Sequence, residues 1–123
     1  MKFTPFLRSV AVSAFALAVQ AHAADFPPSA TLPNAQELAA NLAGKTFQGK
    51  FANGTLMQTV YGSDGSLVAS STGYYDTGRW RTEDGKVCGL LSKFGEFCND
   101  ARLDAGVLYL RRTNGDIVRY EPK

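Results

Sequence analysis

The stretch YYDTGRWRTEDGKVCGLLSKFGEFCNDARL, residues 74–103, decides the fold that we expect for this chain. Its Asp84-Gly85 pair stands between two runs of alternating apolar and polar residues, which is a strong signal for a β-hairpin with a two-residue turn. Such a turn places Trp80 directly opposite Gly89. Opposed residues share one face of a sheet. This face is predicted to be the core, with room for the indole where Gly89 has no side chain.

The chain's two cysteines lie in the same stretch. The hairpin register puts Cys88 on the solvated face opposite Arg81, and a short loop near Phe94 returns the chain so that Cys98 can sit beside it. We therefore predict a cross-strand disulfide on the outer face. A redox or metal pair is the alternative, but the spacing is not C-x-x-C and the chain has no further Cys and a single His, His22, to complete a zinc site. No metal site is predicted.

Period-two alternation begins at residue 45 and continues along the rest of the chain. Asx-Gly pairs at 53–54, 64–65, 84–85 and 114–115 predict four hairpin turns of one kind, and looser turns fall near 72–73, 94–95 and 104–106. The expected strands cover about 46–52, 55–62, 66–71, 74–83, 86–92, 96–103, 106–113 and 116–121. Such strands predict an all-β, eight-stranded up-and-down antiparallel barrel, a lipocalin-like meander with one short N-terminal helix; a sandwich of two four-stranded sheets is the alternative.

Two-residue turns at these pairs give the strands one common inner face. It comprises Phe47, Phe51, Leu56, Val60, Leu67, Ala69, Trp80, Val87, Leu91 and Phe97. Two polar residues, Gln58 and Asp76, fall on the same face and are the candidate ligand-binding residues, because a polar group inside a barrel can orient a ligand. Alternatively, Asp76 lies hydrated at the rim. In the last hairpin, the predicted faces are Leu108, Leu110 and Ile117 on one side and Tyr109, Val118 and Tyr120 on the other.

Residues 1–23 have the pattern of a bacterial secretory signal peptide, with Lys2 and Arg8 ahead of an apolar run and a small-x-small site that ends at Ala23. Cleavage after Ala23 predicts a periplasmic or secreted protein with no transmembrane anchor. Loss of the two cations leaves 11 basic residues of the 13, against 11 acidic ones, so the exported chain is neutral. A neutral chain has no polybasic surface, and no nucleic-acid partner is predicted.

The rest of the chain is predicted to be one domain. Residues 24–33 are Pro-rich and predicted to be an extended N-terminal arm, and 34–123 to be a single barrel domain. Within it, residues 34–43 are predicted to form a short helix with Asn34 as its N-cap. Removal of His22 with the signal peptide excludes mechanisms that need a histidine. We therefore predict a protein that is not an enzyme, with no catalytic residues and no cofactor.

The order GKTFQG (44–49), YGSDGSL (61–67), TGRWRTEDGKVC (77–88), a second Cys and LYLRRTNGDIV (108–118) resembles a family of small exported bacterial proteins of unknown function. Their pattern includes G-x-W-x-x-x-D-G-x-x-C followed by Cys. The resemblance implies a β-rich periplasmic domain and assigns no catalytic residues. The GRW…C hairpin with one disulfide is also similar to small barrel inhibitors of secreted metalloproteases. Those reach the protease cleft with an N-terminal arm, which implies that role for residues 24–33.

Two functions follow as expectations. The first is a non-catalytic binding module of the periplasm or cell exterior, whose partner is a small ligand, an envelope component or another protein. The alternative is an inhibitor of a secreted or host hydrolase, of protease or lysozyme type, that acts through its arm or loops. A deep internal cavity would favour the first function. A filled barrel with a projecting arm would favour the second.

Overall fold

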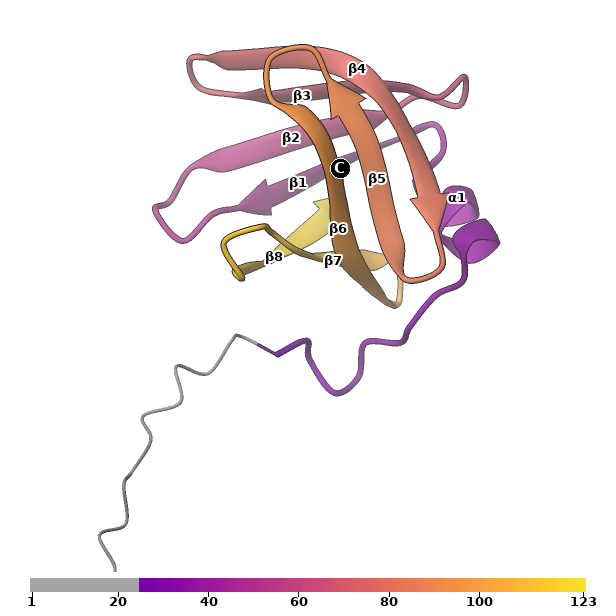
Figure 1. Cartoon of the computed structure of the whole chain (residues 1–123). Coiled ribbons are helices and arrows are strands. Elements are labelled where there is room, and N and C mark those ends of the chain that lie inside the picture. The colour runs from indigo at the N-terminus through magenta and orange to yellow at the C-terminus, as the bar shows by residue number, and fades with distance from the viewer. Residues whose placement is uncertain (1–24) are drawn as a thin grey trace, which may run out of the picture.

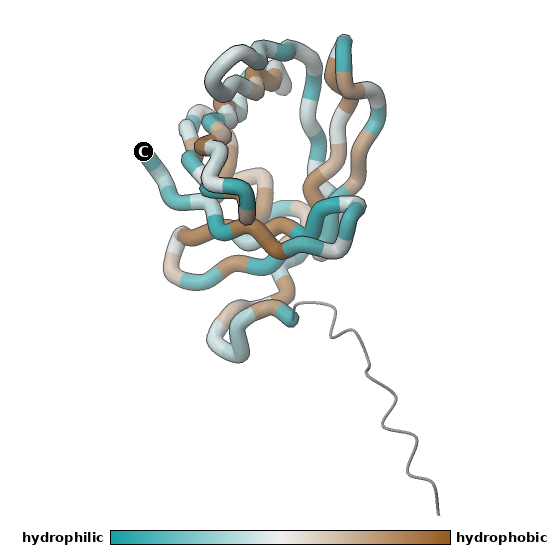
Figure 2. The backbone as a smooth tube through the Cα atoms, turned by 90° about the vertical axis from the view of Figure 1, so that its left-hand side faces the viewer, coloured by the Kyte–Doolittle hydropathy of each residue, from teal (hydrophilic) through white to brown (hydrophobic). Residues whose placement is uncertain are grey.

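The computed structural model describes residues 25–123, so the predicted signal peptide, residues 1–23, lies outside the described residues. The elements are α1 (Ala35–Leu42), β1 (Lys45–Lys50), β2 (Leu56–Tyr61), β3 (Ser66–Ser71), β4 (Tyr74–Glu83), β5 (Lys86–Leu91), β6 (Gly95–Asp104), β7 (Val107–Arg111) and β8 (Ile117–Pro122). Each strand pairs antiparallel with the next, and β8 pairs with β1 to close the barrel (Figures 1 and 2). This closure confirms the predicted eight-stranded barrel and rules out the alternative of a two-sheet sandwich.

Helix α1 covers one end of the barrel. Asn34 caps it as predicted, because its side chain accepts a hydrogen bond from the Glu37 amide at 2.8 Å. Leu38 and Leu42, four residues apart, form one apolar stripe that is fully buried in the core. The helix lies where β4 ends (Figure 1), and the Asp84 carboxylate of the β4–β5 turn accepts from the Ala35 amide at 2.9 Å. None of the helices in the described part of the chain is long and apolar enough to span a membrane.

Residues 25–33 lie along β6 and are fastened to it. Strand β6 continues past its last partner on β5, and Thr31 pairs with Leu103 there through two backbone hydrogen bonds of 2.8 and 3.0 Å. The Ser29 hydroxyl donates to Asp104 at 2.7 Å. The ring of Phe26 lies under the guanidinium of Arg102, 4.6 Å from its centroid. The predicted arm therefore covers an otherwise open strand edge.

Three of the four Asx-Gly turns are longer than predicted. At Asn53-Gly54 the Gly54 amide donates to the Phe51 carbonyl at 2.9 Å and the Phe51 amide to the Thr55 carbonyl at 2.8 Å, the bonds of a type I turn with a glycine bulge. The Asn53 side chain accepts from the Thr55 amide at 2.9 Å, and Gly54 alone takes a positive φ, +87°. Equivalent bonds form at Asp64-Gly65 and Asn114-Gly115. Each bulge shifts the strand register by one residue.

The register shifts turn β2 over, so the predicted inner face is wrong in this strand. The observed partners are Thr59 for Phe47 and Leu67 for Tyr61. Met57, Thr59 and Tyr61 therefore point inward. Leu56, Gln58 and Val60 point outward, against the prediction, and Leu56 is exposed. The last hairpin is corrected in the same way: Leu108, Leu110, Val118 and Tyr120 are buried together, and Ile117 faces the other side.

The predicted β3–β4 and β4–β5 registers are confirmed, including Trp80 opposite Gly89 and Arg81 opposite Cys88. The space above Gly89, however, holds the ring of Phe97, whose Cζ would lie 2.8 Å from an added β-carbon. Trp80 instead meets Tyr61 edge to face, with ring centroids 5.3 Å apart, and its indole N–H donates to the Gly62 carbonyl at 2.9 Å. Trp80 is thus half-buried at the margin of the core.

Candidate functional site

A cavity of about 330 Å³ lies inside the barrel. Its walls are mostly apolar and come from the inner faces of the strands: Met57, Leu67, Ala69, Leu91, Phe97 and Leu110. Its mouth is formed by residues in or beside the four turns at the end of the barrel away from α1: Phe51, Tyr74, Phe94, Arg112 and Thr113. The core packed around Leu38 and Leu42 fills the other end. The cavity is therefore closed at the end of the barrel that the helix covers and open at the opposite end.

Two tyrosines bring polar groups to the inner wall. Tyr61 and Tyr120 are buried and line the cavity. Burial raises the pKa of Tyr120 to about 12 and raises that of Tyr61 further, and the proximity of Tyr120 adds to the increase at Tyr61. Both phenols are therefore neutral at physiological pH and can donate a hydrogen bond. Gly49 makes room for this arrangement, because a β-carbon there would lie 2.7 Å from the Tyr120 ring.

Arg112 is the cation of the mouth. It follows β7 in the β7–β8 turn, and alternation from Leu108 and Leu110 directs it to the inner side of the barrel. Its guanidinium lies over the ring of Phe51, 4.0 Å from the centroid. Arg112 was not predicted from the sequence as a candidate site residue. The i, i+2 spacing of Leu108, Leu110 and Arg112 places the three side chains on one side of the strand, and this pattern could have identified Arg112.

Asp76 lies opposite Ala69 in the predicted register and is buried rather than hydrated, but it does not line the cavity. Its carboxylate accepts hydrogen bonds from the Tyr74 hydroxyl at 2.8 Å and from the amides of Phe94, Lys93 and Thr77 at 2.9–3.2 Å. Burial by itself raises the pKa of Asp76, but these hydrogen bonds outweigh it and hold the pKa below its usual range. Asp76 therefore positions Tyr74 and Phe94 at the mouth.

Gln58, the other candidate ligand-binding residue, lies on the outside of the barrel. Its side-chain oxygen accepts a hydrogen bond from Lys123 Nζ at 2.8 Å, next to a surface hollow over β1, β2 and β8. The one-residue shift at the Asn53-Gly54 turn accounts for this difference. The structure thus separates Gln58 and Asp76, and brings neither to the cavity surface.

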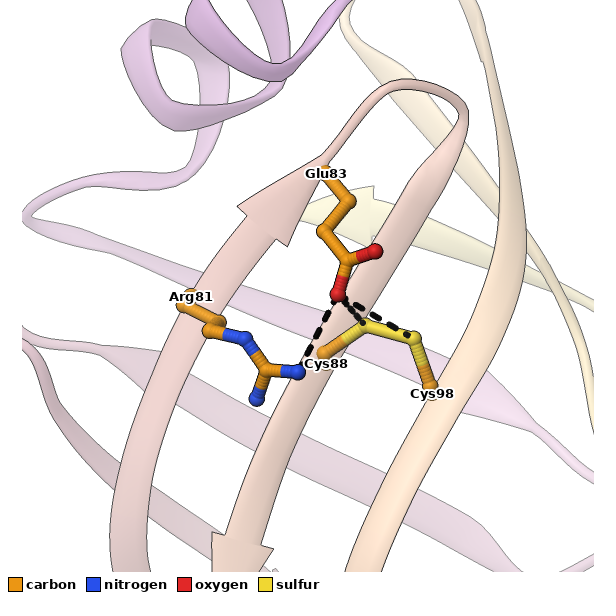
Figure 3. A network of polar contacts seen from close by, with 4 residues as sticks. All are labelled: Arg81, Glu83, Cys88 and Cys98. Atoms are coloured by element: carbon orange, nitrogen blue, oxygen red, sulfur yellow. Dashed lines mark hydrogen bonds and ion pairs between the residues drawn. A yellow bond between two sulfur atoms is a disulfide. The ribbon is translucent and has the colours of Figure 1, made fainter.

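The predicted disulfide joins Cys88 and Cys98, which face each other across β5 and β6 (Figure 3). Cys98 is exposed, whereas Cys88 is buried although it lies on the outer face. Glu83 Oε2 lies 3.5 Å from Cys88 Sγ and 3.9 Å from Cys98 Sγ, and 3.1 Å from the Arg81 guanidinium. Glu83 and the two sulfurs lie close enough to bind one metal ion. The sulfurs are bonded to each other, however, and offer no thiolate.

Replacement of both cysteines by serine is expected to lower the free energy of unfolding by about 2–3 kcal/mol, the loop-entropy value for a short closed loop, and to leave the barrel folded. Urea denaturation of the oxidised protein and of the double variant measures the difference. Because the bond lies outside the cavity, the variant should retain any ligand that the cavity binds. A variant that is folded but no longer binds the ligand would show that the two cysteines contribute to binding and are more than a structural link.

Comparisons with protein-family models, with curated proteins and with solved structures gave no match to this chain. The resemblances stated from the sequence therefore stay hypotheses. Of the features implied for a protease inhibitor, the N-terminal arm is held against β6 by Ser29 and Thr31. These residues would have to detach from the barrel before they could enter a protease cleft.

Proposed function

We propose that this protein binds a small, largely apolar molecule inside its barrel, without chemical turnover. The observation that carries the proposal is the cavity of about 330 Å³, which falls at the lower end of the roughly 300–1,000 Å³ typical of ligand sites. Its lining combines apolar walls with a few phenol, amide and guanidinium groups. These groups bind and orient a ligand at neutral pH, which supports a binding role.

We place this activity outside the cytoplasm, in the periplasm or beyond. The Cys88–Cys98 disulfide supports this location, because such bonds persist in oxidising compartments. The signal-peptide pattern of residues 1–23 supports it independently. A carrier or sensor of a poorly soluble compound in the cell envelope fits both the cavity and the location.

The proposal predicts that an uncharged apolar fluorophore, N-phenyl-1-naphthylamine, gains fluorescence on binding the native protein, and that Ala69→Phe abolishes the gain. Ala69 is buried on the cavity wall, so the added ring fills the space a ligand needs. Val68→Phe on the same strand is the control, because Val68 points outward, opposite Val60. Titrations of the three proteins, each first shown to be folded by circular dichroism, measure the effect.

A second measurement uses the native protein alone. Methyl resonances of Leu67 and Leu91, on the cavity wall, should shift on addition of the fluorophore, whereas those of Leu90, which is 54% exposed on the outside, should stay in place. Equal binding by native protein and Ala69→Phe, with shifts at Leu90 alone, would place the ligand on the surface and refute the proposal.

A further inference from the structure

We propose that the cavity selects a monocarboxylate with an apolar body, and that Arg112 at the mouth binds the carboxylate while the body enters the barrel. The inference rests on the proposed function and adds the chemical class of the ligand. It starts from the position of the only cation among the residues that line the cavity.

The surroundings of the Arg112 guanidinium suit the binding of an anion. It is half-buried, and it is absent from the ion pairs found within residues 25–123, which involve Arg81, Arg111 and Arg119. The ring of Phe51 covers one face of its guanidinium at 4.0 Å and leaves the edge of the guanidinium, with its N–H donors, free to bind. A partly desolvated cation of this kind gains more from an anionic ligand than an exposed one does.

The neighbouring cations do not compete for the same ligand. Lys93, in the β5–β6 turn, donates its Nζ to the Tyr75 carbonyl at 2.7 Å. Arg111 lies on the outer face, near Asp100 and over Phe26. A single guanidinium at the mouth suits an anion of one charge, and its planar fork matches the two oxygens of a carboxylate.

Tyr120 supplies a second contact for the same head group. It lines the cavity and lies close enough to Arg112 for the cation to affect its ionisation. Its neutral hydroxyl can donate to one carboxylate oxygen while the guanidinium donates to both. Beyond this pair the walls are mostly apolar, with Met57, Leu67, Leu91 and Leu110 offering contacts to an alkyl or aromatic body. The polar residues among them, Thr59, Tyr61 and Asn99, carry no second charge.

The test is displacement of N-phenyl-1-naphthylamine from the full exported chain by three ligands with one alkyl chain: octanoate, 1-octanol and octylammonium. Octanoate is expected to displace the fluorophore at concentrations about tenfold or more below those of 1-octanol, because a hydrogen bond between charged groups is stronger than one between neutral groups. Octylammonium is expected to be the weakest, because its charge repels Arg112. Equal potency of octanoate and 1-octanol would overturn the inference and leave the proposed function intact.

Arg112→Gln provides the variant test. It is expected to remove the advantage of octanoate over 1-octanol while the fluorophore itself still binds. Arg112→Lys should restore only part of the advantage, since an ammonium lacks the bidentate fork. The matched control is Arg119→Gln on the outer face of β8, where Arg119 pairs with Glu121, and it should behave as the native protein does. Unchanged octanoate selectivity in Arg112→Gln would overturn the assignment. Failure of the native protein to bind the fluorophore or any octyl ligand would instead refute the proposed function and the inference together.

Discussion

Gly78→Ala is expected to be the most damaging single-methyl addition to the barrel, with a loss of about 3 kcal/mol or more in the free energy of unfolding. A β-carbon at residue 78 would overlap the carbonyl oxygen of Leu90, and it would lie 2.8 Å from the Leu90 carbonyl carbon and 2.9 Å from Leu91 Cα. All three atoms belong to the backbone of β5, so no side-chain rotation relieves the overlap. The β4–β5 ladder would have to separate at the Gly78–Leu91 pair.

Gly73→Ala is the matched control for this substitution. Gly73 lies in the β3–β4 turn with φ +75°, and nothing lies within 4 Å of the site of its missing β-carbon. The control therefore measures only the cost of a positive φ for alanine, on the order of 1–2 kcal/mol. Urea denaturation of the native protein and of both variants gives the two values. If Gly78→Ala costs no more than Gly73→Ala, the close approach of β5 to Gly78 is wrong.

Asp76→Asn is expected to produce the largest loss of stability among isosteric changes of polar residues. The carboxylate receives only donors: the Tyr74 hydroxyl and the amides of Lys93, Phe94 and Thr77. An asparagine would turn an N–H group toward some of these donors and leave them unsatisfied in a buried place. The thermal midpoint should fall by several degrees or more, and ligand binding should weaken, because Tyr74 and Phe94 form part of the mouth.

The same substitution should change the pH dependence of stability. Hydrogen bonds hold the pKa of Asp76 below its usual range in the folded state, so its contribution is complete above the unfolded-state pKa, about 3.9, and is lost as the pH falls through the folded value. The difference in stability between native protein and Asp76→Asn should therefore be constant near neutral pH and shrink in acid. Thermal melts over a pH series measure it.

Asp64→Asn is the control for both effects. The pKa of Asp64 is also lowered, chiefly by the Ser66 hydroxyl, but the residue is exposed in a turn. The oxygen of an asparagine can still accept from the Ser66 amide, as Asn53 and Asn114 do in their own turns. A small change is expected. If the two variants lost equal stability, the burial of Asp76 would not be the cause.

The parts of the fold that depend on Gly73 and Gly85 could be predicted from the sequence. Both glycines lie in two-residue turns, so residue pairs on either side can be read outward without ambiguity, and this places Trp80, Cys88 and Asp76 in the correct register. The eight-strand meander follows from the same alternation, because the number of turns does not depend on their type.

The orientation of β2 could not be predicted because Asx-Gly pairs serve two turn types. The turn at 84–85 has two residues, whereas those at 53–54, 64–65 and 114–115 carry the extra residue of a bulge, stabilised by the Asx side chain. Two such one-residue register shifts lie on either side of β2. Together they cancel, so the register of β3 relative to β1 keeps the predicted inner faces of both strands. The inner faces of β1 and β3 were therefore predicted correctly, whereas β2 between them was predicted with its faces exchanged. For this reason Gln58 was predicted to point inward, although it points outward.

The candidate site was predicted least well, because its polar residues lie where the strands end. Arg112 lies on the same side of the chain as Leu108 and Leu110, but the sequence did not show which face of the last hairpin is the inner one. The role of Asp76 depends on backbone amides of the β5–β6 turn, which no sequence pattern marks. Tyr61 was not predicted as a cavity residue, because the predicted register of β2 directed Val60 inward in its place.

The closure of β8 on β1 has a consequence for the order of assembly. Seven of the eight ladders join strands that are neighbours in sequence and can form as each hairpin becomes available during synthesis, whereas the eighth joins the first and last strands. The entropy of closing so long a loop is lost in this one step, which we expect to be slow. Until Ile117–Pro122 docks, the free edge of β1 can recruit strands from other molecules. The last strand therefore ends the period in which the nascent sheet is prone to aggregate.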